Sequence, residues 1–175
     1  MTNDAATLAA ALIRDVPDFP TPGILFKDIG PLIGDATALR AVIDHFAARH
    51  TDRIDAVAGI EARGFIFGGA LATALGVGFI PIRKRGKLPG GTVERSYDLE
   101  YGSAALAVQV EAVVPGQRVL ILDDVLATGG TAAAACALIE QVHGHVVGVD
   151  VVLELVGLGG RDRLTGRDVH ALTSA

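Results

Sequence analysis

The sequence contains one cysteine, no tryptophan and few aromatic residues. A single thiol, Cys136, excludes an internal disulfide and offers no cysteine cluster for a metal ion. The formal net charge of −5 argues against a nucleic-acid-binding protein, because such proteins present a basic surface. The mildly apolar stretch Ala5–Ile13 is too short to span a membrane, and no basic residue precedes it, which argues against a secretion signal. These absences predict a cytoplasmic protein with neither a membrane nor a nucleic-acid partner.

The residues that are abundant favour one compact unit. Half of the 175 residues are hydrophobic and only 20% are charged, a composition typical of globular domains. No repeat, low-complexity tract or linker divides the chain, so we expect residues 1–175 to form a single domain. The 22 glycines indicate either many tight turns or backbone that approaches a ligand closely.

The N-terminal part is expected to contain two helices separated by an irregular arm. Asp4–Arg14 has apolar residues on one helical face, and Asn3 or Asp4 can cap its start. Ala36–His50 shows the same periodicity, with Asp35 as the cap. The arm between them carries four prolines that break regular structure: Pro17, Pro20, Pro22 and Pro31. An ordered connection of this length is often functional.

After this arm and its second helix, short apolar runs alternate with helical segments. The expected buried strands are Ala56–Ile60, Gly78–Arg83, Val119–Leu122 and Val146–Leu153, and the expected helices are Gly64–Leu75 and Gly130–His143. In Ala104–Val110, the residues Leu106, Val108 and Val110 alternate with small or polar ones, which predicts a half-buried strand in a hairpin with Tyr97–Tyr101. Buried strands that alternate with helices predict an α/β fold, namely a small doubly wound, mostly parallel sheet with helices on both faces.

Ligands of such sheets bind at the carboxyl ends of the strands. The loops expected at those ends are Glu61–Gly64, Arg83–Gly91, Asp123–Thr131 and Leu155–Gly160. These four loops are therefore where we look for chemistry.

One of these loops follows the run Val119–Leu122. It begins with two acids, Asp123 and Asp124, and turns through a Gly-Gly pair into a helix. A turn of this kind leaves backbone N–H groups and the positive end of the helix dipole free for an anion. An ordinary strand–turn–helix joint with Thr131 as the cap is the alternative. Two adjacent carboxylates at the end of a buried strand are unfavourable unless they bind sugar hydroxyls or a cation, so the run indicates a site for a sugar phosphate.

The run VLILDDVLATGGT at Val119–Thr131 resembles the 5-phosphoribosyl-1-pyrophosphate motif of type I phosphoribosyltransferases. The resemblance implies that Asp123 and Asp124 hold the ribose hydroxyls. It also implies that the 5′-phosphate is bound by Ala127, Thr128, Gly129, Gly130 and Thr131. Four other segments resemble the adenine phosphoribosyltransferase family in the same order along the chain: Phe19–Leu32, Glu61–Phe65, Ile82–Gly90 and Tyr97–Gly102.

By the same resemblance, two segments are expected to bind the pyrophosphate. The first comprises Glu61, Ala62 and Arg63, where the family often has a non-proline cis peptide that we place at Glu61–Ala62. The guanidinium of Arg63 suits a diphosphate, although the residues alone also fit a solvated arginine at a helix start. The second is a flap spanning residues 83–103, whose basic run contributes Arg83, Lys84 and Lys87. A charge run is often only a solvated surface, but a basic flap can close over a diphosphate and exclude water.

Residues 1–34 comprise the first helix and the arm, and the arm is expected to bind the base. The resemblance implies that main-chain groups of Phe26, Lys27 and Asp28 read adenine, with Leu158 as the apolar partner across the site. In the hairpin, Glu100 is implied to protonate or orient the purine, and Tyr101 to close the site. From the residues alone, Phe26 also fits a core position, and Glu100 and Tyr101 fit an exposed surface pair.

Taken together, the resemblance implies purine salvage: transfer of the phosphoribosyl group to adenine, giving AMP and pyrophosphate. The implied catalytic residues are Glu100, Asp123, Asp124 and Arg63. Magnesium is the implied cofactor, held mainly through the substrate rather than by protein ligands. The expected partners are adenine, phosphoribosyl pyrophosphate and a second copy of the chain in a homodimer. Two alternatives stay open, namely the same transfer to hypoxanthine, xanthine or orotate, and a regulator that senses phosphoribosyl pyrophosphate.

Overall fold

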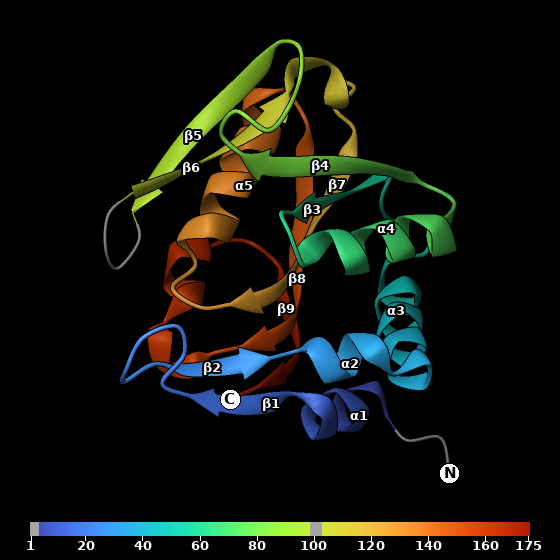
Figure 1. Ribbon diagram of the computed structural model, residues 1–175. Helices are drawn as coiled ribbons and strands as arrows, with labels where there is room; N and C mark the ends of the chain where they lie inside the picture. Colours follow the sequence, from blue (N-terminus) through green and yellow to red (C-terminus); the bar gives the residue numbers. More distant parts are fainter. Residues whose placement is uncertain (1–3, 99–102) are drawn as a thin grey trace.

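The computed structural model describes residues 4–98 and 103–175, and its centre is a seven-stranded sheet. The strand order is β5-β6-β4-β3-β7-β8-β9 (Figure 1). The parallel part of the sheet consists of β3 (Ala56–Ile60), β4 (Gly78–Lys84), β7 (Arg118–Leu126), β8 (His145–Glu154) and β9 (Val169–Ser174). At one edge, the hairpin of β5 (Thr92–Asp98) and β6 (Ser103–Gln109) pairs antiparallel with β4. The predicted α/β fold is confirmed.

Helices cover both faces of this sheet, as Figure 1 shows. The main ones are α3 (Ala36–His50) and α4 (Gly64–Leu75) on one face and α5 (Gly130–Gln141) on the other. Phe67 of α4 shares a buried cluster with Leu120, while Cys136 of α5 shares the other cluster with Ile121. Leu120 and Ile121 are consecutive in β7, so a strand covered on both faces reads as an unbroken apolar run. None of the helices described has the length and apolar character that a membrane crossing requires.

Several predicted elements match the structure at both ends. The segments Ala36–His50, Ala56–Ile60 and Gly64–Leu75 begin and end as expected. Asp35 caps α3, because its Oδ1 accepts a hydrogen bond of 2.8 Å from the backbone N of Ala38. β7 is longer than predicted, since its pairing with β8 continues to Leu126. The two acids therefore lie within a strand, not in the loop after it.

The prediction that prolines leave the arm irregular is wrong. The arm contains the antiparallel pair β1 (Arg14–Pro17) and β2 (Leu25–Asp28), followed by the short helix α2 (Gly30–Gly34). Pro17 is the last residue of its strand and Pro31 lies in the first turn of its helix, and proline is tolerated at both places because no N–H is needed there. Only Pro20 and Pro22 lie in the turn between the strands.

The first helix is shorter than predicted. Helix α1 (Ala5–Leu12) ends before Arg14 because that residue already pairs in β1. Asp4 occupies the cap position but its side chain makes no capping hydrogen bond. The alternative cap, Asn3, lies outside the described residues.

Two further predictions need correction at the edges of the sheet. Val110 does not face inward at the end of β6: it begins the 3₁₀ helix η1 (Val110–Ala112) and is 50% exposed. The C-terminal strand β9 was not predicted, because its residues mix polar and apolar types on both faces. β9 pairs with β8 and is held to α3 by a 3.0 Å contact between Nε2 of His170 and Nε2 of His45.

An ion pair joins the amino ends of β3 and β7. Oδ1 and Oδ2 of Asp55 accept hydrogen bonds from Nη2 (2.7 Å) and Nε (3.0 Å) of Arg118, and Oδ2 also accepts one from the Arg118 backbone N (2.8 Å). The Arg118 side chain and backbone N–H lower the pKa of Asp55 from 3.8 to about 2. A carboxylate with a lowered folded-state pKa stabilises the fold above its unfolded pKa, and this contribution is lost as the pH falls through the folded pKa.

We therefore expect Asp55→Asn to lower the melting temperature at neutral pH and to have little effect at a pH below the Asp55 pKa of about 2. Thermal unfolding of both proteins across this pH range, followed by circular dichroism, measures the difference. An equal difference at every pH would show that the carboxylate charge is not what stabilises this corner.

Candidate active site

A pocket of about 270 Å³ opens at the carboxyl ends of β3 and β7. Its lining comprises Glu61, Ala62, Arg63, Tyr97, Asp123, Asp124, Val125, Ala127 and Thr131. A larger hollow of about 530 Å³ lies between α3 and α4, but Arg40 is the one charged residue among those that line it. The pocket at the strand ends gathers four charged side chains from two predicted loops, so it is the place where chemistry is concentrated.

Asp123 and Asp124 lie next to each other near the end of β7. The Asp124 backbone N donates a hydrogen bond of 2.9 Å to Oδ1 of Asp123, and the Asp124 side chain is buried. Burial and the neighbouring Asp124 charge raise the pKa of Asp123 well above its usual value. Burial also raises the pKa of Asp124, although the nearby Arg63 charge opposes this rise. The protein thus holds the two carboxylates in an environment that is unfavourable for their charge.

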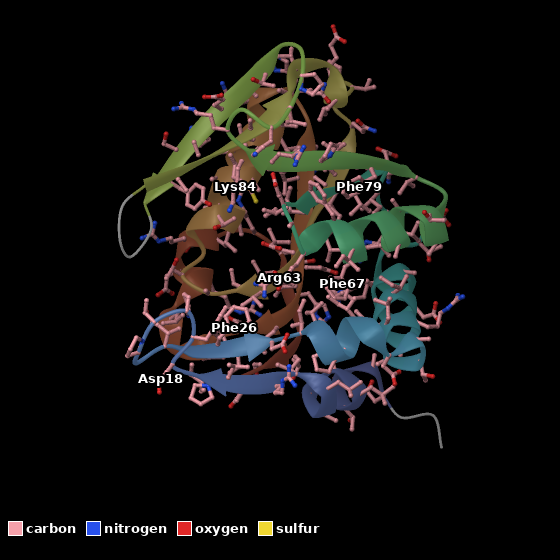
Figure 2. All side chains as sticks on the ribbon, viewed as in Figure 1. Asp18, Phe26, Arg63, Phe67, Phe79 and Lys84 are labelled. Carbon is pink, nitrogen blue, oxygen red and sulfur yellow. The ribbon has the colours of Figure 1, made fainter. Side chains whose placement is uncertain are left out.

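Arg63 lies over the acid pair and reaches towards the arm. Its Nε is 2.8 Å from Oδ2 of Asp124, an ion-pair distance. The N–H does not point at this oxygen, and within residues 4–98 and 103–175 Asp124 Oδ2 finds no hydrogen-bond donor. The Arg63 guanidinium carbon also lies 5.4 Å from the ring centre of Phe26 on β2, within cation–π range. Figure 2 shows Arg63 between Lys84, at the end of β4, and Phe26.

The Gly-Gly turn predicted to bind a phosphate has the geometry of an anion cradle. Gly129 has a φ of 79° and precedes α5, whose first N–H groups have no partner within the helix. A Cβ at Gly129 would lie 2.2 Å from the carbonyl oxygen of Gly160, and a Cβ at Gly160 would lie 2.3 Å from that of Ala127. The loop Ala127–Thr131 therefore rests directly on the backbone at Gly160, at the start of the 3₁₀ helix η3 (Gly160–Leu164).

Glu61 joins the loop after β3 to the end of β4. Its carboxylate accepts hydrogen bonds from Nε (3.1 Å) and Nη2 (3.2 Å) of Arg83 and from the backbone N of Lys84 (3.0 Å). The Arg83 side-chain hydrogen bonds, chiefly, lower the pKa of Glu61. The Glu61–Ala62 peptide bond is cis, at the position predicted from the family resemblance.

The arm brings an aromatic pair to the other side of Arg63. The rings of Phe19 and Phe26 lie edge to face, with centres 5.1 Å apart. The predicted neighbours Lys27 and Asp28 direct their side chains to β1, where Lys27 pairs with Asp15 at 2.7 Å and Asp28 with Arg14 at 2.6 Å. These side chains are engaged within the arm, so any contact with a base would use the main chain.

The structure does not bring every predicted residue to the pocket. Leu158 lies in the 3₁₀ helix η2 (Val156–Leu158), is 52% exposed and does not line the pocket. Lys84 and Lys87 belong to the basic segment at the end of β4, beside the pocket. The predicted residues Glu100 and Tyr101 lie outside the described residues.

Two pocket residues were not predicted, Tyr97 and Val125. Tyr97 and Val93 both pack on the cluster beneath α5, as expected for residues four apart in a strand. A strand prediction that began at Thr92 would have assigned Tyr97 to the inward face of the hairpin. Val125 was missed because β7 was expected to end before the acids.

Comparison with known proteins places this chain in a family. Residues 33–167 match the family model described as "Phosphoribosyl transferase domain". The adenine phosphoribosyltransferase of Thermobifida fusca is 53% identical over 175 residues, covering 99% of each chain. The crystal structure of the Thermoanaerobacter pseudethanolicus adenine phosphoribosyltransferase superposes with a TM-score of 0.93 at 45% identity, covering 97% of this chain and 99% of that one.

A second solved structure carries ligands. It is the adenine phosphoribosyltransferase of Saccharomyces cerevisiae, complexed with an imino-altritol bisphosphate and adenine. It has a TM-score of 0.91 and 40% identity, and the match covers 96% of this chain and 98% of that one.

Proposed function

This chain belongs to the adenine phosphoribosyltransferase family, and from that premise we propose that it transfers the phosphoribosyl group of 5-phosphoribosyl-1-pyrophosphate to adenine, giving AMP and pyrophosphate. One observation on this chain's own residues supports the proposal most directly. The acids Asp123 and Asp124, the cation Arg63 and the two ends of the phosphate loop, Ala127 and Thr131, line one pocket. A sugar phosphate with a diphosphate leaving group needs these three kinds of contact.

The residues have separable roles in this reaction. We propose that Ala127, Thr128, Gly129, Gly130 and Thr131 bind the 5′-phosphate with the free N–H groups of α5 and two hydroxyls. Asp123 and Asp124 accept hydrogen bonds from the ribose hydroxyls. Their negative charge favours the positive charge that develops on the ribose ring as the bond to pyrophosphate breaks. Arg63, with Lys84 and Lys87 of the flap, stabilises the departing diphosphate, and Ala62 contributes backbone contacts beside them.

Magnesium is the cofactor that we propose for this site. Asp124 Oδ2 is a buried carboxylate oxygen without a hydrogen-bond donor among the described residues, and such oxygens are ligands that Mg²⁺ prefers. The described part of the chain has no group of three or more His, Cys, Asp and Glu side chains placed to hold a metal ion. The oxygens of the substrate would therefore supply most of the ligands, with Asp123 and Asp124 beside them. When bound, the ion neutralises charge on the leaving pyrophosphate.

The base is proposed to lie against Phe26, whose ring is already held by Phe19 and Arg63. Main-chain groups of Phe26, Lys27 and Asp28 then read adenine, and Glu100 handles a proton on the purine. Tyr101 and Leu158 are proposed to complete the closure of the site.

We expect Glu100→Gln to reduce turnover by about 100-fold, the usual scale of a general acid or base, with little change in thermal stability. Steady-state rates of AMP formation and a thermal melt of the two proteins measure the two effects. A variant with an unchanged rate would return Glu100 to the role of a surface residue.

A base panel tests the function itself. Pyrophosphate release is measured with magnesium and phosphoribosyl pyrophosphate, with adenine, hypoxanthine, xanthine or orotate supplied in turn. We expect release with adenine, loss of release when the magnesium is chelated, and little release with the other bases. Pyrophosphate release with another base instead of adenine would identify that base as the acceptor. Binding of phosphoribosyl pyrophosphate without release of pyrophosphate for any base would favour the sensing regulator.

We further propose that the chain acts in the cytoplasm as a homodimer. The exposed Ile66 of α4 and the hollow between α3 and α4 support an apolar contact with a second copy. Light scattering after size-exclusion chromatography should give twice the 18.0 kDa of one chain. A mass of one chain at micromolar concentration would contradict the dimer.

A further inference from the structure

Glu61 lines the pocket, yet its carboxylate accepts three hydrogen bonds from Arg83 and Lys84 at the end of β4. We propose that Glu61 is a positioning residue: it holds Arg83 and the backbone of Lys84 and thereby presents the basic segment Lys84–Lys87 to the diphosphate. This inference rests on the proposed function and assigns Glu61 and Arg83 a role different from direct contact with the pyrophosphate.

The hydrogen bonds of Arg83 support this role. All three guanidinium nitrogens donate within the protein, because Nε and Nη2 bind Glu61 and Nη1 binds the carbonyl oxygen of Lys87 at 2.8 Å. The backbone N of Lys87 in turn donates to the carbonyl oxygen of Lys84 at 3.2 Å. Glu61, Arg83 and the Lys84–Lys87 turn thus form one hydrogen-bonded unit. Removing the Glu61 carboxylate would loosen the turn that carries both lysines.

The charges around Glu61 and the Lys84–Lys87 segment also support a positioning role for Glu61. A carboxylate close to a diphosphate would repel it, but Glu61 is paired with Arg83, so the pair adds no net charge. Arg85 pairs with Glu94 on β5. Among the residues that the structure describes, the side chains of Lys84 and Lys87 have no acidic partner within 4.0 Å and are exposed. They are the cations of the segment that remain available for an anion.

The alternative role for Glu61 is to keep Arg83 away from the diphosphate, and it predicts the opposite change in substrate affinity. If Arg83 left Glu61 and bound the diphosphate itself, removing the Glu61 carboxylate would free the Arg83 guanidinium and strengthen substrate binding. The structure disfavours this movement of Arg83, because it would break the three hydrogen bonds that the Arg83 side chain donates.

The test is the Michaelis constant for phosphoribosyl pyrophosphate in Glu61→Gln. We expect a rise of about 10-fold, the scale of losing hydrogen bonds to a charged group, with turnover and the Michaelis constant for adenine nearly unchanged. Calorimetric titration of phosphoribosyl pyrophosphate into the adenine-free protein should show the same loss of affinity. Arg83→Lys should give a similar rise, and the double variant should be no worse than either single one, because the two side chains act as a unit.

Asp55→Asn is the matched control. Like Glu61, Asp55 accepts two hydrogen bonds from an arginine side chain and one from a backbone N–H of a strand. Unlike Glu61, it lies at the amino ends of the strands, away from the pocket. A purely structural effect would therefore appear in both variants, whereas we expect an unchanged Michaelis constant in Asp55→Asn.

An unchanged or lowered Michaelis constant for phosphoribosyl pyrophosphate in Glu61→Gln would overturn the inference. If that variant does not fold, the same comparison on Arg83→Lys decides between the two outcomes. A wild-type protein that releases no pyrophosphate with any base would instead refute the proposed function, and the calorimetric comparison of wild type with Glu61→Gln would then still judge the role of Glu61.

Discussion

Replacing Asp124 by asparagine should lower the turnover number by about 100-fold or more, the scale of removing one electrostatic contact to a transition state. The carboxylate is expected to accept a ribose hydroxyl and to face the positive charge that develops on the ring. An amide of the same size keeps one hydrogen-bonding oxygen but removes the charge. Asp123→Asn should also slow the reaction, and steady-state rates of AMP formation measure both.

The same substitutions should not destabilise the fold. Burial raises the pKa of both carboxylates, so the folded protein binds more protons than the unfolded chain above the ordinary pKa of 3.8. Stability therefore falls as the pH rises through this window, and each ionised carboxylate is unfavourable at neutral pH. We expect the melting temperature of either asparagine variant at pH 7 to equal or exceed that of the wild type.

Asp55→Asn is again the control, because its carboxylate is stabilised by Arg118 and should show the reverse sign. A loss of turnover together with a higher melting temperature would identify the acid pair as a site kept for function at the expense of stability. Full turnover in Asp123→Asn and Asp124→Asn would refute the ribose-binding role.

Gly129→Ala should damage both the fold and the binding of phosphoribosyl pyrophosphate. A Cβ at this position would lie 2.2 Å from the carbonyl oxygen of Gly160, and the backbone φ of 79° is unfavourable for alanine. Overpacking and the left-handed backbone together should reduce the free energy of unfolding by about 2–5 kcal/mol. Because the phosphate loop must move away from Gly160, the Michaelis constant for phosphoribosyl pyrophosphate should rise at least 10-fold.

Gly116→Ala separates the two causes. Gly116 has a φ of 80°, but no atom lies within 4 Å of the place that an added methyl group would occupy, so it shares only the backbone cost. We expect a loss of about 1–2 kcal/mol there and an unchanged Michaelis constant. Urea denaturation with steady-state kinetics measures both variants. Equal effects in the two would show that contact with Gly160 does not shape the loop.

The sequence predicted most accurately the elements whose pattern is local. Helix α3 has a cap residue and a clear apolar periodicity, and the core strand β3 is buried along its whole length, so both were predicted to the residue. The segments β1 and β2 were missed because their pairing joins residues on either side of a proline-containing turn, and proline was read as a break. β9 was missed because a short mixed-polarity strand is specified by its neighbour β8 more than by its own residues.

The candidate site shows the same division. The acid pair and the Gly-Gly loop are contiguous in sequence, so a sequence motif could propose them, and the family resemblance gave the position of the cis peptide. The pairing of Glu61 with Arg83 joins residues 22 positions apart, and no local pattern indicates it. The close approach of Gly129 to Gly160 is likewise a tertiary contact between two backbones. Such contacts were beyond prediction because either partner alone reads as an ordinary loop residue.

A crystal structure of the protein with phosphoribosyl pyrophosphate and magnesium would test the central claim, that one pocket at the ends of β3 and β7 binds the donor. We predict the 5′-phosphate on the loop Ala127–Thr131, the ribose hydroxyls at Asp123 and Asp124, and the diphosphate beside Arg63. Electron density that places the 5′-phosphate at Arg63, or the donor outside this pocket, would contradict the account.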